Sequence, residues 1–509
     1  MNTRNGHLSI LIVVLTTLSI LLSSCAPRPT GAPPIPSIAA INPTNTPQPG
    51  TTRTSEPSPT ATRIPLPVIT LNRGDSYFSL NGKQAFLYSR NPAGNKPEDW
   101  AAIAGMAHQQ GDQFLRVSTN SYAMGGYNGY GYDSKGELQE DWSNNWEHYL
   151  DLTEAEGLYV IPNVGGWIDW NTTTYNTWKD NPFNSANGGP AKDPREIFKK
   201  DSPTQQLYVQ WFKKMVSRWS HHRNIMAWEV MSEVNLIEGI SQPEGLYLAE
   251  QLAKVTREAD TLHRPVTASV ADYSGWDDFL RSDAVEFISY HPYAYNGKQD
   301  VNILERVRNE YMNKYHKPVL IGESGLDAHT PDTVEGRITL ASNARIGIQH
   351  SIWAQLVSGA MNGRALWWED GVGIYFSPLG MPWVEKYTDV EAPVLQFSTG
   401  LDMTGFKPIT AWSSGKVYGA ALGNEETIIG WYRDAACEPP DWNMLPVVSK
   451  QSVTLSVPGK AANWQVDFYS TKTGTDLISS TTVEQKGGVI TIPLPDFTDG
   501  IAFKIHAQK

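Results

Sequence analysis

Short apolar runs alternate with helix-forming stretches through the middle of this chain of 509 residues. Two stripes of apolar residues have helical spacing, one from Leu207 to Trp219 and one from Leu248 to Leu262. Ser241 and Glu244, just before the second stripe, resemble a helix-capping box. Eight apolar runs have the length of buried strands: 85–89, 113–117, 158–162, 225–230, 266–270, 287–290, 319–321 and 365–368. Alternating strands and helices of this number predict an α/β fold, a (β/α)₈ TIM barrel, over residues 68–403.

The pattern changes after Met403. Apolar residues then recur at every second position, as in Val453, Leu455 and Val457, and turn residues separate the runs. This period of two is typical of strands with one buried face. We therefore expect a small antiparallel β-sandwich over residues 404–509.

The first residues read as an export signal. An apolar stretch over residues 8–22 follows Arg4 and ends at Leu22-Ser23-Ser24-Cys25. The stretch is short for a spanning helix, which needs about 20 apolar residues, so residues 1–24 are expected to be a cleaved signal peptide. The four residues that end it resemble a bacterial lipobox. That resemblance implies a diacylglycerol on the thiol of Cys25 and anchorage to the cell membrane or outer membrane, with the folded part outside the cytoplasm.

Residues 25–67 are rich in proline and threonine and contain few large apolar side chains. Such a segment cannot bury a core, and we interpret it as a disordered tether. The formal net charge of −12 argues against nucleic acid as a partner, because phosphate binding requires a basic surface. The charge is compatible with a neutral polymer as a partner, and we expect a monomer.

Two glutamates, Glu233 and Glu323, each follow an apolar run. Helix-forming sequence separates them, so their carboxylates are expected to converge from two strands of one barrel. Paired carboxyl groups about 5–5.5 Å apart act as acid/base and nucleophile in retaining glycoside hydrolases. Glu229 lies inside its strand and would point differently from Glu233, so we expect it to be a buried partner.

Five motifs in chain order resemble those of clan A glycoside hydrolases, the "4/7" barrels, and within them the family 5 cellulases and mannanases. They are Phe114-Leu115-Arg116-Val117, Trp228-Glu229-Val230-Met231-Ser232-Glu233, Ser289-Tyr290-His291-Pro292-Tyr293, Ile321-Gly322-Glu323-Ser324-Gly325 and Ala365-Leu366-Trp367-Trp368. The resemblance covers the barrel and implies a retaining hydrolase for an extracellular β-linked glycan, with β-mannan or β-glucan favoured. It implies no metal and no organic cofactor.

The resemblance also implies a role for each site residue. Glu323 would attack the anomeric carbon, and Arg116 and Tyr293 would stabilise its charge. Glu233 would be the acid/base. The substrate-binding residues would be Arg116, Ser232, His291, Tyr293 and Trp367.

One position departs from the clan. Ser232 stands where the clan usually has asparagine, whose amide contacts the sugar 2-hydroxyl, and a hydroxyl is shorter with a single donor. This substitution motivates an alternative hypothesis, a non-catalytic carbohydrate-binding surface lipoprotein on a degenerate hydrolase barrel. A third hypothesis, an adhesin, has no specific sequence feature in its favour.

Overall fold

The computed structural model describes residues 65–92, 97–119, 129–173, 175–271, 273–293, 298–325, 334–365, 384–413, 415–438 and 447–508. Residues 64–509 form one compact unit. The signal peptide, Cys25, nearly all of the tether, and Trp367 lie outside the described residues. The domain boundaries placed at 68 and 404 stay predictions.

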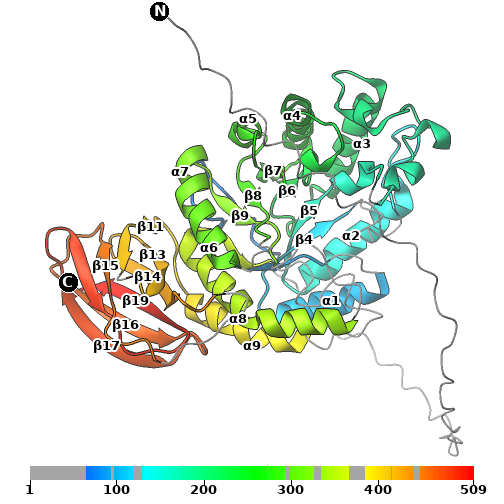
Figure 1. The fold of residues 1–509 in the computed structure, drawn as a ribbon. Helices are drawn as coiled ribbons and strands as arrows, with labels where there is room; N and C mark the ends of the chain where they lie inside the picture. The colour runs from blue at the N-terminus through cyan, green and yellow to red at the C-terminus, as the bar shows by residue number, and fades with distance from the viewer. Residues whose placement is uncertain are drawn as a thin grey trace, which may run out of the picture. The chain divides into compact units, whose positions relative to one another are not determined.

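Eight parallel strands form a closed barrel (Figure 1). Six of them pair in the order β10-β3-β4-β5-β6-β7, and β8 pairs with β9. A bridge between Val319 and Ala360 joins β9 to the start of β10, and the Glu286 N–H donates to the Val266 carbonyl at 2.9 Å between β7 and β8. The strands are β3 (Leu87–Arg90), β4 (Phe114–Ser118), β5 (Tyr159–Asn163), β6 (Trp228–Glu229), β7 (Val266–Thr267), β8 (Ile288–Tyr290), β9 (Val319–Ile321) and β10 (Asn362–Arg364).

Helices surround the barrel strands (Figure 1). They are α1 (Pro97–Gln109), α2 (Glu140–Ala155), α3 (Pro203–Trp219), α4 (Gln242–Ala259), α5 (Asp277–Arg281), α6 (Gln299–Ile303), α7 (Met312–Tyr315), α8 (Val334–Ser358) and α9 (Val384–Ser398). A π-helical segment, η6 (Leu304–Tyr311), joins α6 to α7. Short 3₁₀ turns lie after the third and fourth barrel strands: η1 (Trp167–Trp170), η2 (Thr177–Asp180), η3 (Ser185–Asn187), η4 (Pro194–Phe198) and η5 (Val234–Leu236). A hairpin of β1 (Ser79–Leu80) and β2 (Lys83–Gln84) precedes the barrel.

Both predicted helices are confirmed, although α4 ends at Ala259, before Leu262. Trp211 and Trp219 of α3 are buried, as are Leu248 and Leu252 of α4. The capping box at the start of α4 is present as well, with the Ser241 N–H donating to the Glu244 carboxylate at 3.0 Å. Apolar periodicity and capping were therefore sufficient to place both helices.

The eighth strand was placed wrongly. Apolar residues suggested 365–368, whereas β10 is Asn362–Arg364. Its polar residues are satisfied inside the barrel: the Asn362 side chain accepts from the Ile321 N–H at 2.8 Å and donates to the Ile321 carbonyl at 2.9 Å. Gly363 is necessary because a Cβ there would lie 2.8 Å from the Phe86 ring. A search for apolar runs cannot find such a strand.

Two antiparallel sheets follow the barrel and confirm the predicted β-sandwich. The larger has the order β11-β13-β14-β19-β16-β17, and the smaller has the order β12-β15-β18. Val453, Leu455, Ile490 and Ile492 are all buried in the core between them. The strands are β11 (Lys407–Ile409), β12 (Ala411–Ser413), β13 (Val417–Gly423), β14 (Thr427–Asp434), β15 (Ser452–Ser456), β16 (Asn463–Ser470), β17 (Leu477–Glu484), β18 (Val489–Pro493) and β19 (Gly500–Ala507).

Helix α8 packs against β13 and β14 and so links barrel to sandwich. His350 and Asp499 hydrogen-bond across this junction at 2.7 Å, and both are buried. Within the described ranges, every helix is too short or too polar to cross a membrane.

Candidate active site

The predicted site residues gather at the carboxyl ends of the barrel strands. Glu233 follows β6, Glu323 follows β9, and His291 and Tyr293 follow β8, while Arg116 lies within β4. Because parallel strands present their carboxyl ends at one side of a barrel, side chains distant in sequence meet there. The structure brings together these five residues and Ser232.

Arg116 occupies the centre of the site and is buried. Its Nε and Nη2 donate to the two carboxylate oxygens of Glu229 at 2.5 and 2.9 Å, which is a bidentate arrangement. Its Nη1 donates to Glu323 Oε1 at 2.8 Å. Glu229 is therefore the buried partner expected from its position in the strand, and it fixes the plane of the guanidinium that faces Glu323.

Glu323 has partners on both carboxylate oxygens. Arg116 donates to Oε1, and the Tyr293 hydroxyl donates to Oε2 at 2.7 Å. Burial alone would raise the pKa of Glu323, but the charges of His291 and Arg116 and the hydrogen bond from Tyr293 hold this pKa below its usual value. The carboxylate is therefore kept ionised, as a nucleophile requires.

Gly322 lets His291 lie beside Glu323. A Cβ at this position would lie 2.8 Å from His291 Nε2 and 2.3 Å from Ser289 Oγ. No side chain larger than hydrogen fits between them without displacement. The glycine in the Ile321-Gly322-Glu323 motif thus has a packing role.

Glu233 has a left-handed backbone conformation, with φ 52° and ψ 43°. Non-glycine residues seldom adopt it, and surrounding contacts must hold it in place. The Glu233 N–H donates to Ser269 Oγ at 3.0 Å, and the Ser269 hydroxyl in turn donates to Glu229 Oε1 at 2.9 Å. Ser269 thus connects the backbone of Glu233 to the buried Arg116–Glu229 pair.

His291 lies between the two glutamates. Its Nδ1 is 2.8 Å from Glu233 Oε1 and 3.7 Å from Glu323 Oε2. Burial alone would lower the pKa of His291, but the charge of Glu323 and the hydrogen bond and charge of Glu233 raise it above its usual value. The ligand atoms of these three residues all lie within 4.8 Å of one another. The nearest oxygens of Glu233 and Glu323 are therefore closer together than the carboxyl separation of about 6.5–9.5 Å that inverting glycosidases need for a water molecule.

The same three side chains have the composition of a metal site, but Glu323 Oε1 and Oε2, Glu233 Oε1 and His291 Nδ1 already have partners in the protein, whereas the buried His291 Nε2 has none among the described residues. Arg116 and Tyr293 occupy the oxygens of Glu323, and Glu233 is bonded to His291. A cation would have to displace these contacts and would lie close to the Arg116 charge. The expectation that no metal is needed stays a prediction.

Ser232 is hydrogen-bonded within the site. Its Oγ accepts from Arg116 Nη2 at 2.9 Å and lies 3.4 Å from Ser269 Oγ. The hydroxyl therefore belongs to the hydrogen-bond network around Arg116. Sequence reasoning missed Ser269, although a serine near the end of the apolar run 266–270 was the available signal.

Aromatic residues near the site differ in exposure. The rings of Trp167 and Tyr175 lie 5.8 Å apart, Tyr175 is exposed and Trp167 is half-buried. The backbone N–H of Trp167 donates to the Ser232 carbonyl at 3.1 Å, which holds this pair next to Glu233. Trp170 is fully buried, so it belongs to the core.

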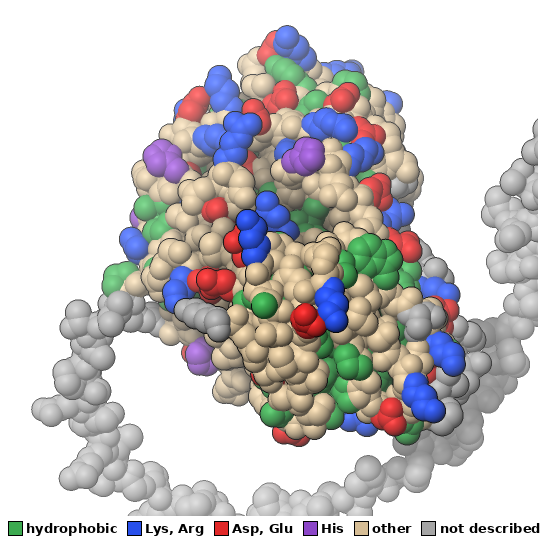
Figure 2. Space-filling model, turned by 90° about the vertical axis from the view of Figure 1, so that its left-hand side faces the viewer, with side chains coloured by type: hydrophobic (Ala, Val, Ile, Leu, Met, Phe, Trp, Pro, Cys, Tyr) green, Lys and Arg blue, Asp and Glu red, His purple; other side chains and the backbone are tan. Residues whose placement is uncertain are grey.

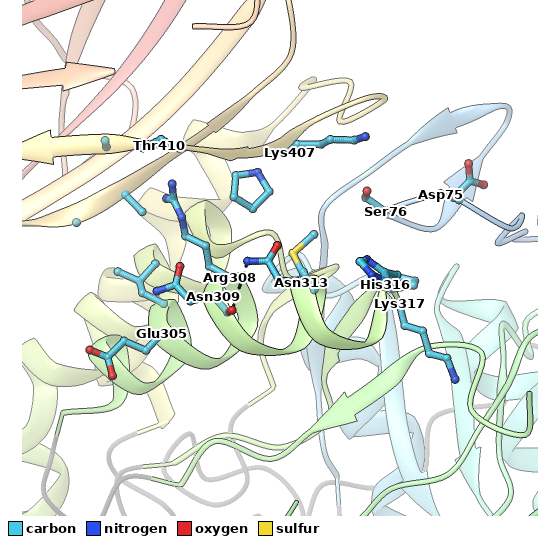
Figure 3. Close-up of a pocket in the computed structure, with 18 of the residues that line it drawn as sticks. Asp75, Ser76, Glu305, Arg308, Asn309, Asn313, His316, Lys317, Lys407 and Thr410 are labelled. Carbon is cyan, nitrogen blue, oxygen red and sulfur yellow. Dashed lines mark hydrogen bonds between the residues drawn. The ribbon is translucent and has the colours of Figure 1, made fainter. Parts of the chain in front are cut away.

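A cavity of about 820 Å³ lies elsewhere, between η6 and β11 (Figure 3). Arg308, Asn309 and Lys407 line it. Lys317, also in its wall, precedes β9, whereas Glu323 follows that strand, so the cavity is at the opposite end of the barrel from the glutamates. The Lys317 amine donates to the Leu280 and Ser282 carbonyls, each at 2.7 Å.

Comparison with known proteins agrees with the barrel fold. Residues 144–344 match the family described as "Glycosyl hydrolases family 2, TIM barrel domain". A solved structure named "Glycoside hydrolase" has a TM-score of 0.57 at 10% identity, covering 87% of this chain and 97% of that one. A family 5 glycoside hydrolase from Bacteroides vulgatus has a TM-score of 0.53 at 10% identity, covering 86% and 93%. No curated protein matches. The TIM-barrel fold and the resemblance to clan A glycoside hydrolases are confirmed, with a family 2 model matching part of the barrel and a family 5 enzyme among the similar structures.

Proposed function

We propose that this chain is a retaining glycoside hydrolase that cleaves a β-linked glycan by double displacement, with Glu323 as nucleophile and Glu233 as acid/base. One observation carries the proposal: Glu323, with a hydrogen bond to each carboxylate oxygen, has an oxygen within 4.8 Å of an oxygen of Glu233. Two carboxylates at this spacing with different partners suit the two roles that retention requires.

In the first step, Glu323 attacks the anomeric carbon and forms a bond to it. The bond from that carbon to the leaving oxygen breaks, and Glu233 gives its proton to this oxygen. The loss of charge on Glu323 weakens its attraction to Arg116, whose position is still fixed by Glu229. The guanidinium is therefore in place when the carboxylate leaves again.

In the second step, a water molecule attacks the anomeric carbon and Glu233 accepts a proton from it. The bond to Glu323 breaks, and Arg116 and Tyr293 again stabilise the carboxylate. The contact between His291 Nδ1 and Glu233 places a second proton-carrying group at the acid/base. His291 thus orients the Glu233 carboxyl in both steps.

The substrate class follows from resemblance. The motifs resemble those of family 5 cellulases and mannanases, so β-mannan and β-glucan are favoured. The half-buried Trp167 and the exposed Tyr175 support a sugar-binding cleft, because aromatic faces pack against the apolar C–H faces of sugars.

The location of the enzyme is also part of the proposal. Lipidation of Cys25 would anchor an exported protein to a membrane through the 25–67 tether. Replacing Cys25 by alanine should move the protein from the membrane fraction to the soluble fraction of the cells that make it. If the variant stays with the membrane, the lipid anchor is wrong, whereas the hydrolase is unaffected.

The function is tested by incubating the protein with β-mannans, β-glucans, xylans and galactans and measuring new reducing ends. The unmutated protein should cut at least one of them, and Glu323→Gln and Glu233→Ala should each lose orders of magnitude in rate. A glycan that is bound but never cut would favour the carbohydrate-binding lipoprotein instead.

A further inference from the structure

Trp412 is exposed on the small sheet of the sandwich. Its exposed fraction is 53%, whereas each of the other tryptophans in the described ranges is buried or half-buried. Its ring makes no aromatic contact and its indole N–H no hydrogen bond with the described residues. Leaving so large an aromatic face in water is unfavourable, because burying it would contribute a large hydrophobic gain.

The residues beside Trp412 form a row across the three strands. Trp412 of β12 pairs with Thr454 of β15, and Thr454 pairs with Thr491 of β18. Residues paired across strands point to the same face of a sheet, so the indole and the two threonines lie on one surface. The threonine hydroxyls are 3.0 Å apart. Strand spacing of about 4.8 Å makes the row roughly 10 Å long.

The three strands contain no charged residue. β12 reads Ala-Trp-Ser, β15 reads Ser-Val-Thr-Leu-Ser and β18 reads Val-Ile-Thr-Ile-Pro. The larger sheet differs, because it pairs Asp467 with Lys504 across β16 and β19. Seen from the side of the sandwich, backbone and side chains that are neither hydrophobic nor charged cover much of the surface, and hydrophobic and charged side chains form separate patches among them (Figure 2). In a chain of net charge −12, three adjoining strands without charge make an unusual surface.

This surface has the chemistry to hold sugar rings. An indole face packs on the apolar C–H face of a pyranose, and hydroxyl groups exchange hydrogen bonds with sugar hydroxyls. No cation is present on the strands to attract a charged polymer. We propose that the outer face of the β12-β15-β18 sheet, centred on Trp412, binds a neutral polysaccharide, and the choice of ligand rests on the proposed function.

A second copy of the chain fits the surface less well. A stable interface buries about 800 Å² on each partner, with an apolar centre. One indole supplies about 150–250 Å², and its neighbours on this face are mainly serine and threonine. A linear ligand that stacks on one ring needs no such area. The surface therefore matches a glycan chain better than a protein.

The site would hold a polymer at the sandwich while the barrel cuts it. Two contacts on one chain raise the effective concentration of the polymer at the cleft. The binding site at Trp412 should then lower the KM for long glycans but not for short ones, which cannot reach both the sandwich and the barrel.

Binding is measured by affinity electrophoresis of the full chain in gels that contain soluble β-mannan, β-glucan or xylan. The Glu323→Gln variant, which should not degrade the gel, serves as the parent. Adding Trp412→Ala should weaken retardation about tenfold, and Trp412→Phe should retain most of it. Leu477→Ala removes a comparably exposed side chain from β17 and should change nothing. Equal retardation of parent and Trp412→Ala, or no retardation by any of the three glycans, would overturn the proposal.

Hydrolysis separates this proposal from the proposed function. In the protein with Glu323 intact, Trp412→Ala should leave the rate on a short oligosaccharide unchanged and raise the KM for polymer about tenfold. If retardation depends on Trp412 but the protein hydrolyses no glycan, the proposed function is contradicted and the binding site at Trp412 is kept. If the protein hydrolyses the polymer and Trp412→Ala does not change the KM, the proposed function is kept and the binding site at Trp412 is contradicted.

Discussion

Of two buried clusters of arginine and carboxylate in the barrel, one is balanced in charge and the other has more carboxylates than arginines. In the first, called here the closed cluster, Arg90 and Arg364 contact Asp112 at 2.6 and 2.9 Å and both contact Glu391 at 3.3 Å. Two positive and two negative groups thus cancel, and no side chain in the cluster is more than 1% exposed.

The second, called here the open cluster, has one arginine for three carboxylates. Arg116 binds Glu229 and Glu323, and Glu233 lies nearby with His291 as its partner. The side chains of Glu323 and Glu233 are 10% and 14% exposed. A buried site with an excess of one charge and an opening to solvent is where perturbed pKa values and reactivity are expected. Buried ion pairs alone therefore do not indicate a functional site, whereas an excess of one charge together with exposure to solvent does.

The largest predicted effect comes from the open cluster. Glu323→Gln removes the attacking charge and keeps the shape, so glycan hydrolysis should fall by about 10³-fold or more. Stability should fall only by what the ionised Glu323 contributes, because Arg116 keeps its bidentate bond to Glu229. Initial rates and urea unfolding of the same preparation measure both quantities. A variant that keeps a tenth of the activity would show that Glu323 is not the nucleophile.

The closed cluster should show the opposite response. Asp112→Asn leaves two buried guanidinium groups short of one negative charge, and the free energy of unfolding should fall by about 3–5 kcal/mol. Activity per folded molecule should stay near that of the unmutated protein. Asp193→Asn is the matched control, since its pair with Arg195 is exposed and should contribute less than about 1 kcal/mol. Urea titration measures the free energy of unfolding of both variants. Equal losses in the two would show that the buried cluster contributes no more to stability than an exposed ion pair.

Tyr293→Phe tests how the open cluster keeps Glu323 ionised. Without the hydroxyl donor the pKa of Glu323 should rise toward its usual value, and the acid limb of the profile of kcat/KM against pH should move to higher pH. Because the folded pKa of Glu323 is depressed, its ionisation stabilises the fold above the unfolded pKa, and this stabilisation is lost as pH falls through the folded value. Tyr293→Phe should lose part of this stabilisation.

The rate at neutral pH should fall about tenfold in this variant, in line with one lost charge-assisted hydrogen bond. Tyr273→Phe is the control, because its buried hydroxyl donates to the Ser289 carbonyl at 2.8 Å rather than to a catalytic carboxylate. An unchanged acid limb in Tyr293→Phe, or the same shift in both variants, would contradict the assigned role.

Ser269→Ala gives the smallest expected effect. It removes the acceptor for the Glu233 N–H and a donor to Glu229, so the left-handed backbone at Glu233 loses one constraint. We expect kcat to fall about threefold to tenfold, near 1 kcal/mol, with KM unchanged. Ser289→Ala is the control, because its buried hydroxyl has no hydrogen-bond partner among the described residues. A loss of stability without a change in kcat would make Ser269 a purely structural residue.

The two clusters also differ in how far sequence could reveal them. Glu233, Glu323, His291 and Tyr293 each follow an apolar run, so barrel topology places them together once the strands are recognised. The closed cluster gives no such signal, because Arg90, Asp112, Arg364 and Glu391 occur in separate segments without a shared motif, and only tertiary packing joins them.

Tertiary contacts also explain why β10 was placed wrongly and why the partner of Ser232 was missed. Apolar runs could not locate β10, whose polar residues are satisfied by neighbouring strands. Motif resemblance named Ser232 as a sugar contact but could not show that its hydroxyl accepts from Arg116. Side-chain partners of this kind depend on distances between strands, which periodicity does not report.

The most direct test of the central claim is the configuration of the first product. Proton NMR of the hydrolysis mixture, recorded before the anomers equilibrate, shows which anomer forms from the glycan that the protein cuts. A double displacement through Glu323 with Glu233 within 4.8 Å predicts the β-anomer first. Initial formation of the α-anomer would mean direct attack by water and would contradict the assignment of Glu323 as nucleophile.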